Sequence, residues 1–140
     1  MDLRASAHSY LVPVRFPKAV KLIRRALSES ELSVVAEFEA MRLCDAEQNG
    51  RWEPFRILLV DCPFLSFEAQ AFDRAAGVFF PLHVYVGAEG DRTYTFLASS
   101  SDLFANRLPL GVAGPMAKLL DRVTVALESV LLHAELEGRS

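Results

Sequence analysis

Hydrophobic and polar residues follow two different rhythms along the first part of this chain. Residues 32–40 alternate with a period of two apart from Val35, which is typical of a β-strand with one wet face, and residues 9–16 (SYLVPVRF) predict a first strand. Residues 17–30 instead carry apolar side chains at helical spacing, and a proline at the start suits the first turn of a helix. Pro13 cannot donate a ladder hydrogen bond, so we expect the first strand to lie at an edge of its sheet or to be irregular.

The middle of the chain changes to longer apolar runs. Residues 55–60 (FRILLV) are almost unbroken, as in a central strand that is covered on both faces. A helix is predicted next, capped by Ser66 and ended by Gly77 in the left-handed conformation. Two β-rich runs then follow at 78–86 and 92–98, and the glycine-containing loop between them predicts a hairpin.

The remaining segments complete the order of elements. Residues 115–136 are amphipathic and predict the longest helix, opening at Pro115. Residues 41–54 stay undecided between a short helix and a turn. The order β-α-β-β-α-β-β-α predicts an α+β fold: a two-layer sandwich with a mixed, mostly antiparallel sheet of about five strands. A length of 140 residues suits a single domain over 1–140.

Composition adds an expectation of self-association. Apolar residues make up 51% of the chain and the mean hydropathy is +0.20, which is rich for a small domain. A second copy of the chain is the simplest cover for surplus apolar surface, so we expect a homodimer. The net charge of −3 argues against nucleic acid as a partner. No apolar run is long enough for a membrane span or a secretion signal, and two cysteines fit a cytoplasmic protein.

The part of the chain from Arg56 to Leu97 resembles the family catalogued as Domain of Unknown Function 302. The resemblance rests on a strand that ends in LLVDCP, a short helix, the run GVFFPLHVYV and the turn and strand GAEGDRTYTF. Its signature residues are Pro63, Gly77 and Pro81. Members often have Cys-Asn-Pro where this chain has Asp-Cys-Pro, and Asp-Pro before the glycine, which is missing here. The resemblance implies a small α+β fold that tends to dimerise, and it implies no reaction.

Asp61, Cys62 and His83 form the candidate catalytic group. Cys62 follows a strand and precedes a helix, where a thiol can ionise easily, and His83 is a candidate base with Asp61 as its orienter. The alternative is a buried structural cysteine, an ordinary strand histidine and a helix-capping aspartate. The cysteines and histidines together lack the close spacing of a metal site, so we expect no metal and no cofactor (Cys44, Cys62, His8, His83 and His133).

Phenylalanines gather around the signature prolines. Phe64, Phe67 and Phe80 are the candidate ligand-binding residues, because aromatic side chains at this density can line an apolar pocket. Core packing and a dimer interface explain the same density. Glycine-rich phosphate-binding motifs are missing, and Glu37 and Glu39, on one strand face, are explained by exposure to solvent.

The residues therefore leave the function open between two hypotheses, and with it the question of whether the chain is an enzyme. The first is a non-enzymatic homodimeric module with room for a small apolar or amphipathic ligand. The second is a small cysteine-dependent enzyme or redox protein that uses Cys62 with Asp61 and His83. The reactivity of the Cys62 thiol distinguishes the two.

Overall fold

The structure is a computed structural model that describes residues 7–44, 50–98 and 108–138. Its elements confirm the predicted order and the α+β class. They are β1 (Ala7–Val12), α1 (Phe16–Glu29), β2 (Ser33–Leu43), β3 (Trp52–Asp61), α2 (Pro63–Phe72), the 3₁₀ helix η3 (Arg74–Phe79), β4 (Leu82–Glu89), β5 (Arg92–Ala98) and α4 (Leu110–Gly138).

The five strands form one sheet in the order β1-β5-β4-β3-β2, and every neighbouring pair is antiparallel. The sequence predicted a mixed, mostly antiparallel sheet; the structure shows that the sheet is entirely antiparallel. Helix α1 carries the chain from one edge strand, β1, to the other, β2, so it does not join parallel neighbours. Strand β1 lies at an edge, one of the two expected alternatives, because β5 is its one neighbour among the described strands. It spans Ala7–Val12 rather than 9–16, so Pro13 lies just outside it.

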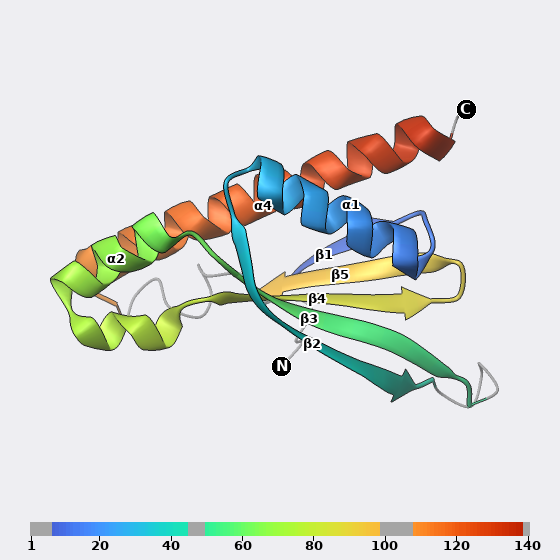
Figure 1. Cartoon of the computed structure of the whole chain (residues 1–140), viewed down its shortest axis with the longest axis horizontal. Helices are drawn as coiled ribbons and strands as arrows, with labels where there is room; N and C mark the ends of the chain where they lie inside the picture. The colour runs from blue at the N-terminus through green and yellow to red at the C-terminus, as the bar shows by residue number, and fades with distance from the viewer. Residues whose placement is uncertain (1–6, 45–49, 99–107, 139–140) are drawn as a thin grey trace.

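Helices α1 and α4 lie together on one face of the sheet (Figure 1). Alternate strand residues such as Leu58, Val84 and Val86 point into this layer and are fully buried there. They meet Ile23 and Leu27 of α1 in one hydrophobic core. Burying each such side chain contributes about 1.5–3 kcal/mol, so the helix layer is the main source of the stability of the domain.

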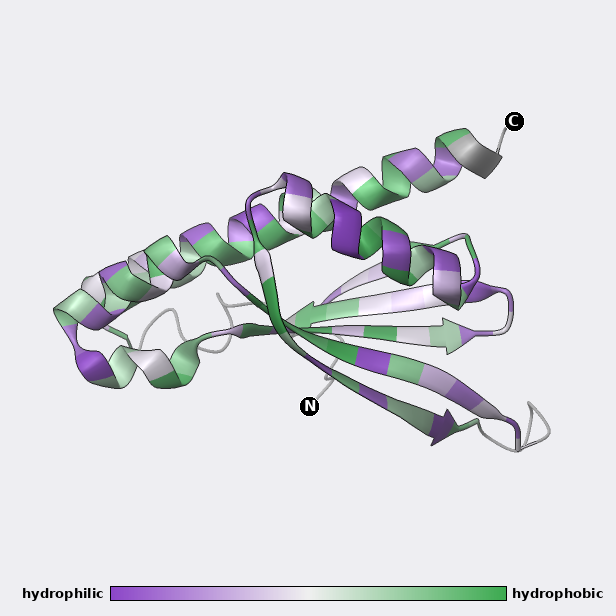
Figure 2. Ribbon diagram, in the orientation of Figure 1, coloured by the Kyte–Doolittle hydropathy of each residue, from purple (hydrophilic) through white to green (hydrophobic). Residues whose placement is uncertain are grey.

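Helix α1 shows how local sequence sets these positions. Pro17 lies in the first turn, where its missing N–H costs no hydrogen bond. The apolar residues at helical spacing are all buried, whereas the charged residues between them face solvent, as the banding of α1 in Figure 2 shows. The helix ends where Glu31 takes a positive φ of 61° and the N–H of Leu32 donates to the carbonyl of Leu27 at 3.0 Å.

Segment 41–54, which the sequence left undecided, forms the end of β2 and the start of β3 where the structure describes it. Residues 41–43 end β2 and residues 52–54 begin β3, so a short helix is excluded there; residues 45–49 lie outside the described part. The register of β2 shifts between Val34 and Ala36, which is a β-bulge. From Ala36 onward the register therefore points Ala36 and Phe38 away from the helices, and Glu37 and Glu39 toward them.

The second helix differs from the expectation at both ends. Helix α2 begins at Pro63 with Cys62 at the N-cap, and Ser66 lies buried inside it, where its Oγ accepts a hydrogen bond from Gln70. Gly77 lies within η3 and has no positive φ; the glycines with positive φ in the described chain are Gly50 and Gly90. The 3₁₀ turn of η3 starts at Asp73, whose carboxylate accepts the N–H of Ala75 at 2.9 Å.

The hairpin and the last helix are confirmed with shifted boundaries. Strand β4 begins at Leu82, because the residues before it belong to η3 and to the Phe80–Pro81 peptide, which is cis. The turn to β5 is shorter than expected and holds Gly90 at a φ of 64°. Helix α4 begins at Leu110, so Pro115 lies inside it rather than at its start. Its first turns pack on α2 rather than on the sheet.

Candidate functional site

The side of the sheet that faces away from α1 and α4 carries no layer of described residues. We call it the open face. It is formed by alternate strand residues, since successive side chains point to opposite sides of a sheet. Most of its central side chains are apolar and only partly buried: Leu11 of β1, Tyr94 and Phe96 of β5, Tyr85 of β4, Phe55, Ile57 and Leu59 of β3, and Phe38 of β2. Strand β3 is therefore covered on one side only, not on both.

Aromatic rings form a continuous row across four strands of the open face. Phe38 lies 6.3 Å from Phe55, and Phe55 stacks on Tyr85 with centroids 5.3 Å apart. Tyr85 in turn lies 5.6 Å from Phe96, which is stacked with Tyr94 at 6.1 Å. Pairs at these distances contribute about 0.5–1.5 kcal/mol beyond their buried area, so the row is an ordered surface and not a set of scattered rings.

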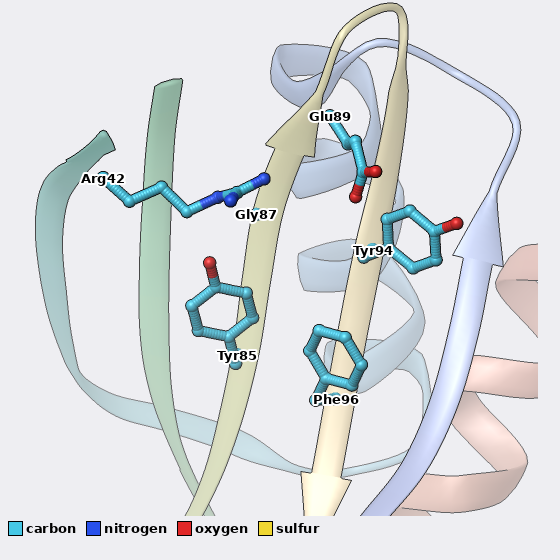
Figure 3. Close-up of a pocket in the computed structure, with 6 residues that line it drawn as sticks. All are labelled: Arg42, Tyr85, Gly87, Glu89, Tyr94 and Phe96. Atoms are coloured by element: carbon cyan, nitrogen blue, oxygen red, sulfur yellow. The ribbon is translucent and has the colours of Figure 1, made fainter. Parts of the chain in front are cut away.

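A shallow hollow of about 230 Å³ lies at the hairpin end of this row. Figure 3 shows its lining on the viewer's side of the sheet: Arg42, Tyr85, Gly87, Glu89, Tyr94 and Phe96. Arg42 and Glu89 reach in from opposite sides, with Gly87 between them. The hollow thus combines an aromatic floor with one positive and one negative side chain.

Arg42 is held in place by two groups below it. Its Nη2 donates to Glu53 at 3.4 Å and to the carbonyl of Ala88 at 3.3 Å. Glu53 is buried, and its other oxygen accepts the N–H of Gly90 at 2.9 Å. Arg51 approaches the same carboxylate at 3.9 Å. A buried carboxylate needs such partners, so Glu53 is the anchor that fixes Arg42 at the hollow.

Tyr85 keeps its proton in this environment. Burial raises the pKa of its phenol above the ordinary value of 10.0, the charge of Arg42 lowers it, and Glu89 raises it. The phenol is therefore neutral at physiological pH and offers one O–H donor and an acceptor oxygen. In Figure 3 its hydroxyl points toward the guanidinium of Arg42.

The structure separates the three candidate catalytic residues. Cys62 is buried in the core on the helix side, where Nη1 of Arg122 lies 3.7 Å from its Sγ. Asp61 and His83 both belong to the open face by strand alternation. Asp61 accepts the N–H of Cys62 at 2.8 Å, and burial raises the pKa of its carboxyl above 3.8 while this hydrogen bond lowers it. His83 is exposed and lies opposite Leu59 of β3, on the other side of the sheet from the thiol.

The candidate ligand-binding phenylalanines are also divided. Phe64 and Phe67 lie on the outer side of α2, where 75% and 72% of each residue is exposed. Phe80 is partly buried and packs against the main core and against a second, smaller hydrophobic cluster. This second cluster consists of Ala69, Ala76, Val112 and Met116. Phe72, at the end of α2, is 58% exposed. The structure therefore places Phe64 and Phe67 at the surface of α2 and Phe80 against the core.

The aromatic row of the open face was not predicted from the sequence. Its rings come from strands that the sequence predicts, but the sequence alone does not show which alternate positions of neighbouring strands share a face. The available signal was the spacing of two in HVYVG and TYTFL, which places Tyr85, Tyr94 and Phe96 on a common face once the hairpin register is known. That register depends on the turn at Gly90, so the row could not be drawn from spacing alone.

Among the described residues, no group of three or more histidine, cysteine, aspartate or glutamate side chains is arranged to hold a metal ion. Of the helices in the same ranges, none has the length and apolar character needed to cross a membrane.

Comparison with known proteins identifies a family and no activity. Residues 8–130 match the family described as Domain of unknown function DUF302. The fold is similar to the crystal structure of an uncharacterized conserved DUF302 protein from Bacillus stearothermophilus, with a TM-score of 0.72 and 17% identity over 88% of this chain and 96% of that one. No match is found among curated proteins. Because the family match spans most of the sequence, the chain belongs to the DUF302 family.

Proposed function

We propose that the protein is a non-enzymatic homodimeric module that pairs through its open face and holds a small amphipathic ligand there. The observation that carries the proposal is the row of five partly exposed rings on a sheet face that no other described element covers. Soluble monomers rarely leave an apolar patch of several hundred Å² in contact with water, and such patches mark interaction sites.

The size of the open face fits a second copy of the chain. Five strands about 4.8 Å apart and some 25 Å long give a flat footprint on the order of 600 Å². A standard protein interface buries about 800 Å² per partner. The accessible surface of the open face exceeds its flat footprint, because side chains project from the sheet, and so approaches this area. Two sheets facing each other would lie about 10 Å apart, with the helix layers outside.

The charges of the open face also suit pairing with itself. Arg42 and Glu89 lie at the same end of the face but on different strands, β2 and β4. In a two-fold interface each surface meets its own copy, so a patch that carries both signs can match positive with negative groups. A patch with a single sign of charge would repel its copy.

A stacking platform for nucleotide bases is the other common use of aromatic rows on sheets. Such platforms are surrounded by basic residues that neutralise phosphates. Here Glu53, Asp61 and Glu89 belong to the same face as Arg42, and the whole chain carries a net charge of −3. The charges therefore favour a second copy over a nucleic acid.

Native mass spectrometry of the purified protein tests the dimer. We expect a dimer for the unmodified chain and predominantly monomer for Phe38→Glu, which places a charge on the most exposed ring of the row. Leu132→Glu is the matched control, since Leu132 is similarly exposed but lies on α4, outside the open face. A monomeric wild-type protein, or equal loss of dimer in both variants, would overturn the proposal. Extra mass on the dimer would identify a retained ligand.

One observation favours the second hypothesis, a cysteine-dependent enzyme or redox protein. Cys62 occupies the N-cap of α2, and the guanidinium of Arg122 lies beside its sulfur. Reactive cysteines are commonly found beside a cation at the start of a helix. In this form of the hypothesis Arg122 replaces His83 as the residue that activates the thiol, because His83 lies on the opposite face.

Alkylation of the folded protein tests this alternative. Cys44→Ala leaves Cys62 as the single thiol, since Cys44 and Cys62 are the two cysteines of the chain. Rapid labelling at mildly acidic pH that becomes slow in Arg122→Gln would support cysteine chemistry. Labelling that occurs only after unfolding would rule it out and leave Cys62 as a buried structural residue.

A further inference from the structure

We propose that the hollow between Arg42 and Glu89 binds a small zwitterion with an aromatic body, the class to which the aromatic amino acids belong. This inference rests on the proposed ligand-binding function and deepens it by naming the ligand. It is carried by two opposite charges that reach into one hollow from opposite sides above stacked rings (Figure 3).

The opposite charges of Arg42 and Glu89 make a singly charged ligand a poorer fit than a zwitterion. An anion that pairs with Arg42 meets the carboxylate of Glu89, and a cation that pairs with Glu89 meets the guanidinium of Arg42. Each like-charge approach costs part of the gain from the favourable contact. A molecule that carries a carboxylate and an ammonium group satisfies both side chains at once.

Hydrogen-bonding groups are available on both sides. In the described structure Arg42 uses Nη2 for Glu53 and Ala88 and also lines the hollow. A guanidinium has five N–H donors, so Arg42 has further donors to offer a carboxylate. The protonated phenol of Tyr85 adds a donor on the same side. Glu89 accepts from an ammonium group on the other side.

The floor and the volume restrict the body of the ligand. Tyr85 and Phe96 lie 5.6 Å apart at 43° and, together with Tyr94, offer ring faces and edges to a flat apolar group. A hollow of about 230 Å³ holds roughly eight waters at about 30 Å³ each, which corresponds to a ligand of about a dozen non-hydrogen atoms. An amino acid with one aromatic ring has this size.

Calorimetric titration with three compounds that share a phenylethyl group tests the inference. L-phenylalanine carries both charges, 3-phenylpropanoate lacks the ammonium group, and 2-phenylethylamine lacks the carboxylate. We expect L-phenylalanine to bind at least about tenfold more tightly than either analogue, because each lost charge removes a charge-assisted hydrogen bond. Equal or tighter binding of an analogue, or no binding of L-phenylalanine, would overturn the ligand class.

Variants show whether the named residues cause the preference. In Glu89→Gln, L-phenylalanine should no longer bind more tightly than 3-phenylpropanoate but should still bind more tightly than 2-phenylethylamine. In Arg42→Lys, the preference for L-phenylalanine over 2-phenylethylamine should weaken. Glu68→Gln, an exposed glutamate on α2, should change neither. An unchanged preference in Glu89→Gln would contradict the assignment.

The oligomeric state, measured on the same samples, separates this inference from the proposed function. A dimer without the expected order of affinities overturns the ligand class alone. A monomer that still shows this order overturns the dimer and leaves the ligand class standing.

Discussion

The phenol of Tyr85 occupies the space left by the missing side chain of Gly87. A Cβ built on Gly87 would lie 2.6 Å from the phenolic oxygen and 2.7 Å from the nearest ring carbon, which is closer than real Cβ contacts. Gly87 has no positive φ, so its role is to leave space rather than to adopt an unusual backbone conformation. The position of the ring next to Arg42 therefore depends on a glycine two residues further along the strand.

Gly87→Ala should displace the Tyr85 ring and lower the free energy of unfolding. Forcing a side chain from its rotamer costs about 1–3 kcal/mol, which exceeds the gain that alanine brings over glycine in a strand. Urea denaturation measures the change. The control is Gly77→Ala, where the added Cβ would meet Gln70 at an ordinary 3.5 Å, so we expect little effect.

A double-mutant cycle assigns the cost to this contact. In a Tyr85→Leu background the shorter side chain no longer reaches over Gly87, and Gly87→Ala should then be neutral or slightly stabilising. If Gly87→Ala is equally costly in both backgrounds, the ring of Tyr85 is not the cause.

The second prediction concerns Asp61 and pH. Burial raises the pKa of this carboxyl above its ordinary 3.8, and the N–H of Cys62 offsets part of the rise. The folded state therefore binds more protons than the unfolded state in the interval between the two pKa values. Within that interval the free energy of unfolding should fall as the pH rises, and the loss should be complete above the folded pKa.

Asp61→Asn isolates this contribution, because an amide keeps the oxygen that accepts the N–H of Cys62 and removes the charge. The stability of the variant relative to the wild type should rise with pH from below 3.8 and then level off. Urea denaturation at a series of pH values measures it. A difference that stays constant with pH would show that the Asp61 carboxyl titrates equally in both states.

The strands and helices were predictable because most of them carry one strong period. Helix α1 was found almost to the residue, since Pro17 marks its first turn and its apolar residues follow helical spacing. Helix α4 was cut short because Pro115 was interpreted as a start signal, whereas the helix begins five residues before it, at Leu110. Proline favours the first turn of a helix over its interior, so the local signal at Pro115 pointed to a later start than the structure has.

The face of each strand was harder to predict than the strand itself. The bulge between Val34 and Ala36 moves Phe38 to the open face and turns Glu37 toward the helix layer, where it meets Arg24 and Arg56. A bulge adds one residue without a sequence signal, and one residue reverses the face of everything after it. The open face and its hollow depend on that register and on contacts between distant strands, which explains why the sequence pointed to Phe64 and Phe67 instead.

Two buried threonines on β5 should respond oppositely to loss of their hydroxyl groups. Thr93 and Thr95 are both fully buried, but only Thr93 has a hydrogen-bond partner among the described residues: its Oγ1 donates to the carbonyl of Val14 at 2.9 Å. Valine has nearly the same shape as threonine without the hydroxyl group. Thr93→Val should therefore lower the free energy of unfolding by about 1–2 kcal/mol, because it leaves the Val14 carbonyl without its donor.

Thr95→Val should have the opposite sign. It removes a buried hydroxyl that gains no hydrogen bond in the folded state, so we expect a stabilisation of up to about 1 kcal/mol. Chemical denaturation of the two variants side by side makes each the control of the other, since both remove the same atom from the same strand. If Thr95→Val is as destabilising as Thr93→Val, the hydroxyl of Thr95 has a partner in solution, such as a buried water, that stabilises the sheet.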